Sequence, residues 1–90
     1  MTATLTPRGI RRDLYAILER HAPDGVVISG RTTIAGDLAL DSLGVMEVIA
    51  DIEKRFAVVV PDERLPELFA VEDVERELVA FLRGHGRLSS

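Results

Sequence analysis

The chain contains no cysteine, which excludes disulfide bonds and thiolate metal sites. It therefore has no thiol of its own, and its composition fits a reducing cytoplasm. Aromatic residues are scarce as well, with one tyrosine, three phenylalanines and no tryptophan. The core must be built mainly from Leu, Ile, Val and Ala, and this composition favours packed helices.

The chain also lacks long apolar runs. None approaches the roughly 20 residues needed to span a bilayer, and the N-terminal MTATLTPRG has no apolar signal segment. We therefore expect a soluble, cytoplasmic, monomeric protein that does not bind membranes. Its 90 residues are enough for one small domain, so we expect residues 1–90 to form a single domain. The ordered part should run from about residue 6 to 84, with a loose tail at 85–90.

Charge is distributed unevenly along the chain. Residues 1–31 contain three acidic residues and five arginines, whereas residues 37–77 contain twelve acidic residues and only four basic ones. An acidic surface repels nucleic acid and attracts basic surfaces of other proteins. The second stretch therefore predicts basic protein partners and excludes nucleic acid.

Apolar residues recur at helical spacing in three stretches. The first follows Thr6 and Pro7, a favourable N-cap and first turn, and ends near His21. The second runs from about Ser42 to Arg55, and the last ends at Gly84. The expected buried stripes are Ile10, Leu14, Ile17 and Leu18, then Val45, Val48, Ile49, Ile52 and Phe56, and finally Val74, Leu78, Phe81 and Leu82. With a short helix within residues 62–70, interrupted or begun by Pro66, the pattern predicts an all-α fold.

A long connection, residues 22–40, joins the first two predicted helices. It is rich in Gly, Ser, Thr and Asp, and its VVI segment has no neighbouring strand to pair with. We expect a loop held to the core by Val27, Ile34, Leu38 and Leu40. Loops of this length are uncommon in small domains unless they have a function. A second break is expected after the second helix, in VVVP, at Pro61.

Ser42 stands at the start of the second predicted helix, between Asp41 and Leu43. Serine is among the commonest N-cap residues, so one interpretation of Ser42 is purely structural. Nucleophilic catalysis requires a base oriented toward the serine. The two histidines, His21 and His85, lie in no motif, and we expect both to be solvated. A serine hydrolase is therefore disfavoured.

No metal site is predicted. Counted from Asp37, a calcium-binding loop requires glycine at its sixth position and glutamate at its twelfth, where the chain has Ser42 and Val48. Histidine and acidic residues nowhere cluster at ligand spacing, and there is no glycine-rich phosphate loop.

One face of the second predicted helix combines apolar and charged residues. On a helical wheel, Leu43, Met46 and Ala50 surround Glu47, away from the buried stripe. Several exposed apolar residues beside a hydroxyl favour a docking surface. The alternative is that they contact the long loop. The expected docking face comprises Leu43, Met46, Glu47, Ala50, Asp51, Glu53 and Lys54.

From about Thr6 to Leu82 the chain resembles the acyl carrier protein family, the small carriers of fatty acid, polyketide and related pathways. The resemblance centres on DLALDSLGVMEVIADIEKRF, residues 37–56, followed by VVVPDE. It includes the Asp-Leu entry, the Asp-Ser-Leu triplet and a glutamate five residues after the serine. An aromatic residue that closes the second helix and a hydrophobic-Pro-Asp step into the short helix complete it.

The resemblance implies a four-helix carrier fold with a short third helix and a long first loop. It also implies that Ser42 receives 4′-phosphopantetheine from coenzyme A, transferred by a magnesium-using phosphopantetheinyl transferase. Asp41 and Leu43 would flank this site, and Asp41 would serve the transferase or its metal. The thiol of the arm would carry the cargo as a thioester, which accounts for a carrier without cysteine.

By the same resemblance the chain is not an enzyme. It is a substrate for enzymes with basic docking surfaces that load and process acyl or aminoacyl groups. A long acyl cargo could fold back between the helices, lined by residues such as Ile52, Val60, Phe69 and Val74, whereas a short polar cargo could remain in solvent.

Five residues depart from the family pattern. Ala39 replaces a glycine and so makes a positive φ less favourable. Ala70 replaces a capping Thr or Ser, Pro66 is unusual in the third helix, and Gly44 and Lys54 stand where acidic residues are frequent. These departures favour a specialised natural-product pathway over the general fatty acid branch. The alternatives are an aminoacyl or peptidyl carrier and an unmodified interaction or regulatory module with the same fold.

Overall fold

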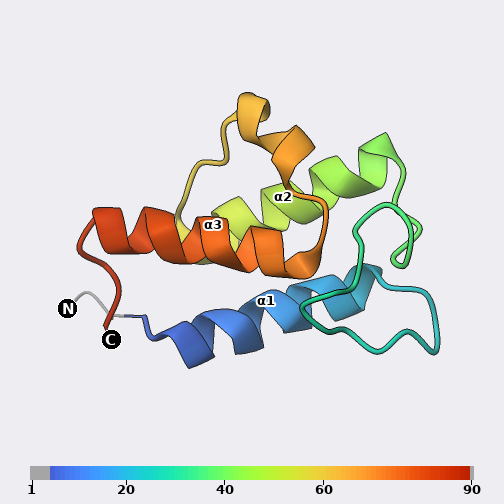
Figure 1. Cartoon of the computed structure of the whole chain (residues 1–90), viewed down its shortest axis with the longest axis horizontal. Coiled ribbons are helices and arrows are strands. Elements are labelled where there is room, and N and C mark those ends of the chain that lie inside the picture. Colours follow the sequence, from blue (N-terminus) through green and yellow to red (C-terminus); the bar gives the residue numbers. More distant parts are fainter. Residues whose placement is uncertain (1–4, 90) are drawn as a thin grey trace.

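This computed structural model describes residues 5–89 of the chain. Four helical segments and the loops between them make up this part (Figure 1). The helical segments are the α-helices α1 (Pro7–His21), α2 (Ser42–Phe56) and α3 (Val71–Gly84) and the 3-10 helix η1 (Asp62–Glu67). α1 packs against both α2 and α3, and in Figure 1 η1 lies on the side of these two helices opposite α1. The predicted all-α fold with a short helix before the last one is confirmed.

The predicted beginning and end of α1 are confirmed. Thr6 is the N-cap, and its Oγ1 accepts a hydrogen bond from the Gly9 amide at 3.1 Å. Pro7 occupies the first helical position, where its missing N–H costs nothing. The helix ends at His21, and the four residues predicted to face the core are buried.

The core is almost entirely aliphatic, as the composition predicts, and Phe56 is its single fully buried aromatic residue among residues 5–89. In α2 and α3 most of the predicted stripe residues are buried. Val45 and Phe81 are only partly buried and pack at the edge of the core. Val71, which the helical pattern did not include, is fully buried at the start of α3.

The loop between α1 and α2 contacts the core through Ile34 and Leu38, which are buried, and through Leu40, which is partly buried. The prediction for Val27 is wrong, because 86% of its surface is exposed. Val26 and Ile28 pack against the core instead. Neighbouring side chains in an extended segment point to opposite sides, so contact through these two residues directs Val27 to solvent.

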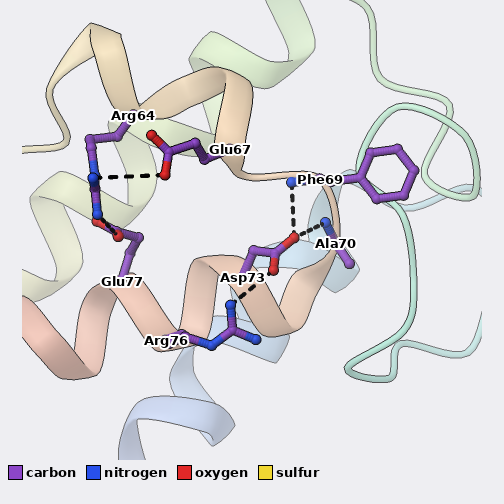
Figure 2. Close-up of polar contacts among 7 residues, drawn as sticks. All are labelled: Arg64, Glu67, Phe69, Ala70, Asp73, Arg76 and Glu77. Carbon is purple, nitrogen blue, oxygen red and sulfur yellow. Dashed lines mark hydrogen bonds and ion pairs between the residues drawn. The ribbon is translucent and has the colours of Figure 1, made fainter.

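The first turn of α3 is held by Asp73 within it and by the long loop, because the N-cap Ala70 has no side-chain acceptor. The carboxylate of Asp73 accepts hydrogen bonds from the amides of Phe69 (3.1 Å) and Ala70 (2.8 Å), as Figure 2 shows. Two carbonyl groups of the long loop accept from the amides of Val71 and Glu72, at 2.9 and 2.8 Å. The capping residue that the chain lacks is thus replaced by Asp73 and by the loop.

The prediction of a loose tail at 85–90 is wrong for residues 85–89; Ser90 lies outside the described residues. The backbone of Leu5 pairs with the tail, donating to Arg87 O at 3.1 Å and accepting from the Ser89 amide at 2.6 Å. The Arg87 guanidinium donates to the carbonyls of Phe56 and Ala57, the latter at 2.9 Å. Residues 85–89 therefore link Leu5 to the C-terminal end of α2.

Candidate functional site

Ser42 is the first residue of α2, and its side chain is exposed. The N-cap is Asp41, whose Oδ1 accepts from the Gly44 amide at 2.8 Å, so the capping role considered for Ser42 belongs to its neighbour. The next amide, of Val45, donates to Asp41 O at 2.9 Å. Ser42 is thereby free of the structural function that most often explains a serine at a helix start.

The amides of Ser42 and Leu43 have no hydrogen-bond partner within residues 5–89. Unpaired amides and the positive end of the helix dipole favour an anion at this position. A phosphodiester on the Ser42 oxygen would be placed beside them. The residues present therefore fit a phosphate-linked group attached to Ser42.

The segment before Ser42 is fixed by a local hydrogen-bonded turn. The Thr33 amide donates to Asp37 Oδ2 at 2.9 Å, and the Asp37 amide donates to Thr33 Oγ1 at 2.8 Å. Leu38 is buried directly after this turn, and Ala39 adopts a left-handed conformation with φ of 54°. The Asp-Leu part of the motif is thus explained by structure: Asp37 closes the turn, and Leu38 fixes it to the core.

Gly44 allows the same segment to approach α2 closely. A Cβ atom at Gly44 would lie 3.0 Å from Leu40 Cδ2 and 3.3 Å from Asp41 Oδ1. Any larger residue would force one of these side chains to shift. Glycine at this position, where the resemblance leads one to expect an acidic residue, therefore lets Leu40 pack against the first turn of α2.

Four predicted docking residues are exposed on one side of α2. Leu43 and Met46 expose 69% and 52% of their surface, and Glu47 and Ala50 are also exposed. Their spacing of three or four residues places them next to one another on the helix. These apolar side chains do not cover the long loop, which was the alternative explanation for them. Lys54, one helical turn beyond Ala50, is exposed too.

The other two predicted docking residues are engaged within the chain. Asp51 Oδ2 lies 2.8 Å from His21 Nε2 and 3.9 Å from an Arg20 nitrogen. The hydrogen bond with His21 is the main reason that the pKa of Asp51 lies below its usual value. Glu53 Oε2 accepts from the Val60 amide at 2.8 Å and so fixes the connection to η1. Both carboxylates have structural partners, which the helical wheel cannot reveal.

The expectation of two solvated histidines is wrong for His21 and holds for His85. His21 is partly buried and pairs with Asp51, joining the end of α1 to α2. His85 is exposed, but its ring stacks on Phe81 at 4.1 Å between centroids, and its Nδ1 lies 2.9 Å from Phe81 O. Each histidine thus has a partner other than Ser42.

A partly open, mostly apolar cavity of about 320 Å³ lies between α2, the segment leading into η1, and α3. Ile52, Val60 and Val74 line it as predicted, but Phe69 does not, and 69% of its surface is exposed. Ala70 and Val71 directly after Phe69 are buried. Figure 2 shows the Phe69 ring pointing away from α3. The apolar residues Ala70 and Val71, which take the buried positions directly after Phe69, are the sequence signal that could have corrected this prediction.

A smaller cavity of about 30 Å³ lies nearer the start of α2. It is lined by Val45, one turn after Ser42, and by Leu65 of η1. The two cavities share the walls formed by Ile49, Ile52, Leu68 and Val74. A series of apolar side chains therefore leads from the first turn of α2 toward the large cavity.

Within residues 5–89 no group of three or more His, Cys, Asp or Glu side chains is arranged to hold a metal ion. None of the helices in the same range has the length and apolar character required to cross a membrane.

The exposed hydroxyl of Ser42 and the unpaired amides beside it fit a group attached through a phosphate. Comparison with known proteins defines the class of protein. The family model described as "Phosphopantetheine attachment site" matches residues 12–81.

Curated relatives agree with this match. The chain is similar to the acyl carrier protein of Campylobacter hominis, with 38% identity over 63 residues, 70% of this chain and 77% of the relative. It is similar to that of Helicobacter pylori, with 35% identity over 63 residues, 69% of this chain and 81% of the relative. A third acyl carrier protein, from an Exiguobacterium species, is 36% identical over 59 residues, 66% of this chain and 75% of the relative.

The chain therefore belongs to the acyl carrier protein family. Its function is that of an acyl carrier, and its cofactor is covalently attached 4′-phosphopantetheine. Members of this family are carriers and not catalysts, and they interact with phosphopantetheinyl transferases and acyl-processing enzymes.

Proposed function

We propose that Ser42 is the residue that carries the 4′-phosphopantetheine arm. The observation that supports this assignment is the combination of an exposed hydroxyl with the unpaired amides of Ser42 and Leu43 at the start of α2. The arm supplies the thiol on which cargo is held as a thioester. Asp41 caps the helix through Oδ1, which leaves its other carboxylate oxygen available to the transferase or its magnesium ion.

The chain acts as a substrate of other enzymes, as a single monomeric carrier domain over residues 1–90 in the cytoplasm. The absence of cysteine supports this proposal, because the thiol must then come from the arm. His21 and His85, the residues best suited to act as a base, pair with Asp51 and stack on Phe81. Ser42 therefore acts as an acceptor that the transferase activates.

The partners are a phosphopantetheinyl transferase and loading and processing enzymes with basic docking surfaces. Leu43, Met46 and Ala50 supply the apolar part of the contact, with Glu47 as its exposed acidic residue. Asp51, Glu53 and Lys54 form the border of this face. Lys54 selects dedicated partners, because a basic surface suited to a fully acidic carrier would be repelled by it.

The cargo is an acyl group of a specialised pathway, of polyketide or related type, and its chain folds into the cavity between α2, η1 and α3. An apolar cavity of about 150 Å³ already holds benzene, so one of about 320 Å³ has room for a larger apolar group. Four residues that line both this cavity and the smaller one provide an apolar route from the α2 N-terminus.

The test is the intact mass of the protein after incubation with coenzyme A and a broad-specificity phosphopantetheinyl transferase. One added phosphopantetheine group is expected in the wild type and none in Ser42→Ala, whose helical circular dichroism should be unchanged. Ser29→Ala is a matched control, because Ser29 is exposed in the long loop. Modification of Ser42→Ala would show that the arm is attached elsewhere. An unmodified wild type would favour the interaction module.

A further inference from the structure

Two charged residues, Arg64 of η1 and Glu77 of α3, interrupt the apolar lining of the large cavity within residues 5–89. Their side chains are 44% and 35% exposed. Because they are only partly exposed and also line the cavity, they lie where it meets solvent. A group that occupies the cavity therefore lies beside these two charges, whichever way it enters.

Arg64 is held by two carboxylates, as Figure 2 shows. Its Nε donates to Glu77 Oε2 at 3.2 Å, and its Nη2 donates to Glu77 Oε1. Its Nη1 lies 3.7 Å from Glu67 Oε1. The two carboxylates raise the pKa of Arg64 above its usual value. The guanidinium is thus charged, and all three of its nitrogen atoms face a glutamate within the chain.

The cluster of Arg64, Glu67 and Glu77 contains one positive and two negative charges. A carboxylate that approaches it meets a net negative charge and a guanidinium whose nitrogens are already paired. Elsewhere in the cavity it would meet apolar walls, and burial of an unpaired carboxylate there is strongly unfavourable. A neutral acyl chain meets neither obstacle, because it leaves the ion pairs intact and gains from burial.

We propose that this cluster selects cargo by charge, so that the cavity admits neutral acyl chains and excludes chains that end in a carboxylate. This inference rests on the proposed attachment of the arm to Ser42 and on the proposed folding of cargo into the cavity. On this proposal, the cluster determines which thioester-bound cargo is buried in the cavity and which remains in solvent. Its members are specificity residues and have no part in the chemistry of loading.

The first experiment compares two cargoes of equal carbon number, hexanoyl and adipoyl, which differ by a terminal carboxylate. Each is transferred to the wild-type protein from the corresponding acyl-coenzyme A by the transferase. We expect hexanoyl to shift the methyl resonances of Ile52, Val74 and Leu78 and to raise the thermal unfolding midpoint relative to the protein with the bare arm. Adipoyl should leave both unchanged. Equal effects of the two cargoes would overturn the proposal.

The second experiment removes the negative charges. In Glu67→Gln/Glu77→Gln the guanidinium is no longer neutralised, so adipoyl should now shift the same resonances and raise the midpoint. Glu63→Gln is the matched control, because Glu63 is an exposed glutamate of η1 that does not line the cavity. It should behave as the wild type. If the double variant still discriminates against adipoyl, the cluster is not the selecting element.

Failure of this inference and failure of the proposed function give different results. The mass of the protein reports first whether the arm and cargo are attached. If no arm is attached, the proposed modification itself is wrong, and this inference falls with it. If both cargoes are attached and neither shifts the cavity resonances, the proposed folding of cargo into the cavity is wrong as well, although the arm is attached. If both cargoes shift the resonances equally, the charge selection alone is overturned.

Discussion

The two ends of α2 differ in how their backbone groups are satisfied. At the start, the amides of Ser42 and Leu43 have no partner within residues 5–89, and the cap is the adjacent Asp41. At the other end, the distant Arg87 donates its guanidinium to the last carbonyls, those of Phe56 and Ala57. One end is left available to an external group, whereas the other is closed by the tail.

This difference separates the positions used for function from those used for stability. Helix starts with unpaired amides bind anions, so the open end is suited to a phosphate-linked arm. The closed end includes the fully buried Phe56 and the left-handed Ala57, whose carbonyl groups accept hydrogen bonds from Arg87 of the tail. Substitutions at the closed end should therefore change folding, and substitutions at the open end should change modification and docking.

The largest expected effect is that of Phe56→Ala at the closed end. Truncation of a buried aromatic residue typically costs about 3 to 5 kcal/mol, and Phe56 is only 2% exposed. A loss of this size would unfold much of a small domain. The free energy of unfolding from denaturant titration measures it, with Ser42→Ala as the open-end control. If the two variants are equally stable, the contrast between the ends is wrong.

The next effect concerns the tail. Arg87→Met keeps much of the side-chain volume but removes two hydrogen bonds from a cation to backbone carbonyls, a loss of about 1 to 3 kcal/mol. Arg83→Met is the matched control, since Arg83 is exposed in the last turn of α3. It should change the free energy of unfolding by less than about 0.5 kcal/mol. Equal stability of the two variants would show that the tail does not hold α2.

Positive φ values at alanine give a smaller effect. Ala39, shortly before the start of α2, and Ala57, directly after its end, both have φ of 54°. The left-handed conformation costs a non-glycine residue about 1 to 2 kcal/mol, and glycine loses part of this gain through its greater freedom in the unfolded chain. Ala39→Gly and Ala57→Gly should each stabilise by about 0.5 to 1 kcal/mol in denaturant titration. Ala16→Gly, at an exposed position within α1, should destabilise instead.

What the sequence predicted well was encoded within a few residues. Thr6 and Pro7 define the start of α1 through their own hydroxyl and ring, and the apolar stripes define the core through helical periodicity. The open end of α2 belongs to this group, because Asp41 and Ser42 are adjacent to the groups that they serve. The predicted start at Ser42 is confirmed, whereas the cap that was considered for Ser42 is supplied by Asp41.

What the sequence could not predict depends on contacts between distant residues. The tail looked loose because nothing local orders it, yet Arg87 binds α2, and residue 5 pairs with Ser89. Asp51 looked free on a helical wheel, although His21 from another helix binds it. The Arg64 and Glu77 pair across the cavity is similarly non-local. A helical wheel places a side chain on a face but does not identify what lies opposite it.

The start of α3 is closed by the Asp73 carboxylate. Its contribution to stability should therefore depend on pH. Hydrogen bonds from the Ala70 backbone, followed by the pairing with Arg76, keep the pKa of Asp73 below its usual value of 3.8. Because the folded pKa is the lower one, the stabilisation is complete above the unfolded value and is lost as the pH falls through the folded value. Asp73→Asn should therefore be less stable than wild type at pH 7.

The difference between Asp73→Asn and wild type should shrink as the pH falls below about 3.8, the usual value for this carboxyl. Thermal unfolding midpoints at several pH values measure this convergence. Asp24→Asn, an exposed carboxylate of the long loop, is the control and should match wild type throughout. A constant difference between Asp73→Asn and wild type at every pH would show that the charge of Asp73 contributes nothing.

The smallest effect on folding is expected at the docking face beside the open end. Glu47 and Met46 are exposed, so Glu47→Lys and Met46→Glu should change the free energy of unfolding by less than about 0.5 kcal/mol. Their effect should appear in transfer rates with the transferase and with loading enzymes. Reversal of an exposed charge chiefly slows association and alters its salt dependence, so the defect of Glu47→Lys should diminish as salt is raised, whereas that of Met46→Glu should persist. Lys54→Glu should instead raise the transfer rate with an enzyme that acts on acyl carrier proteins in general. Wild-type rates for both Glu47→Lys and Met46→Glu with every partner would place the docking face elsewhere on the molecule.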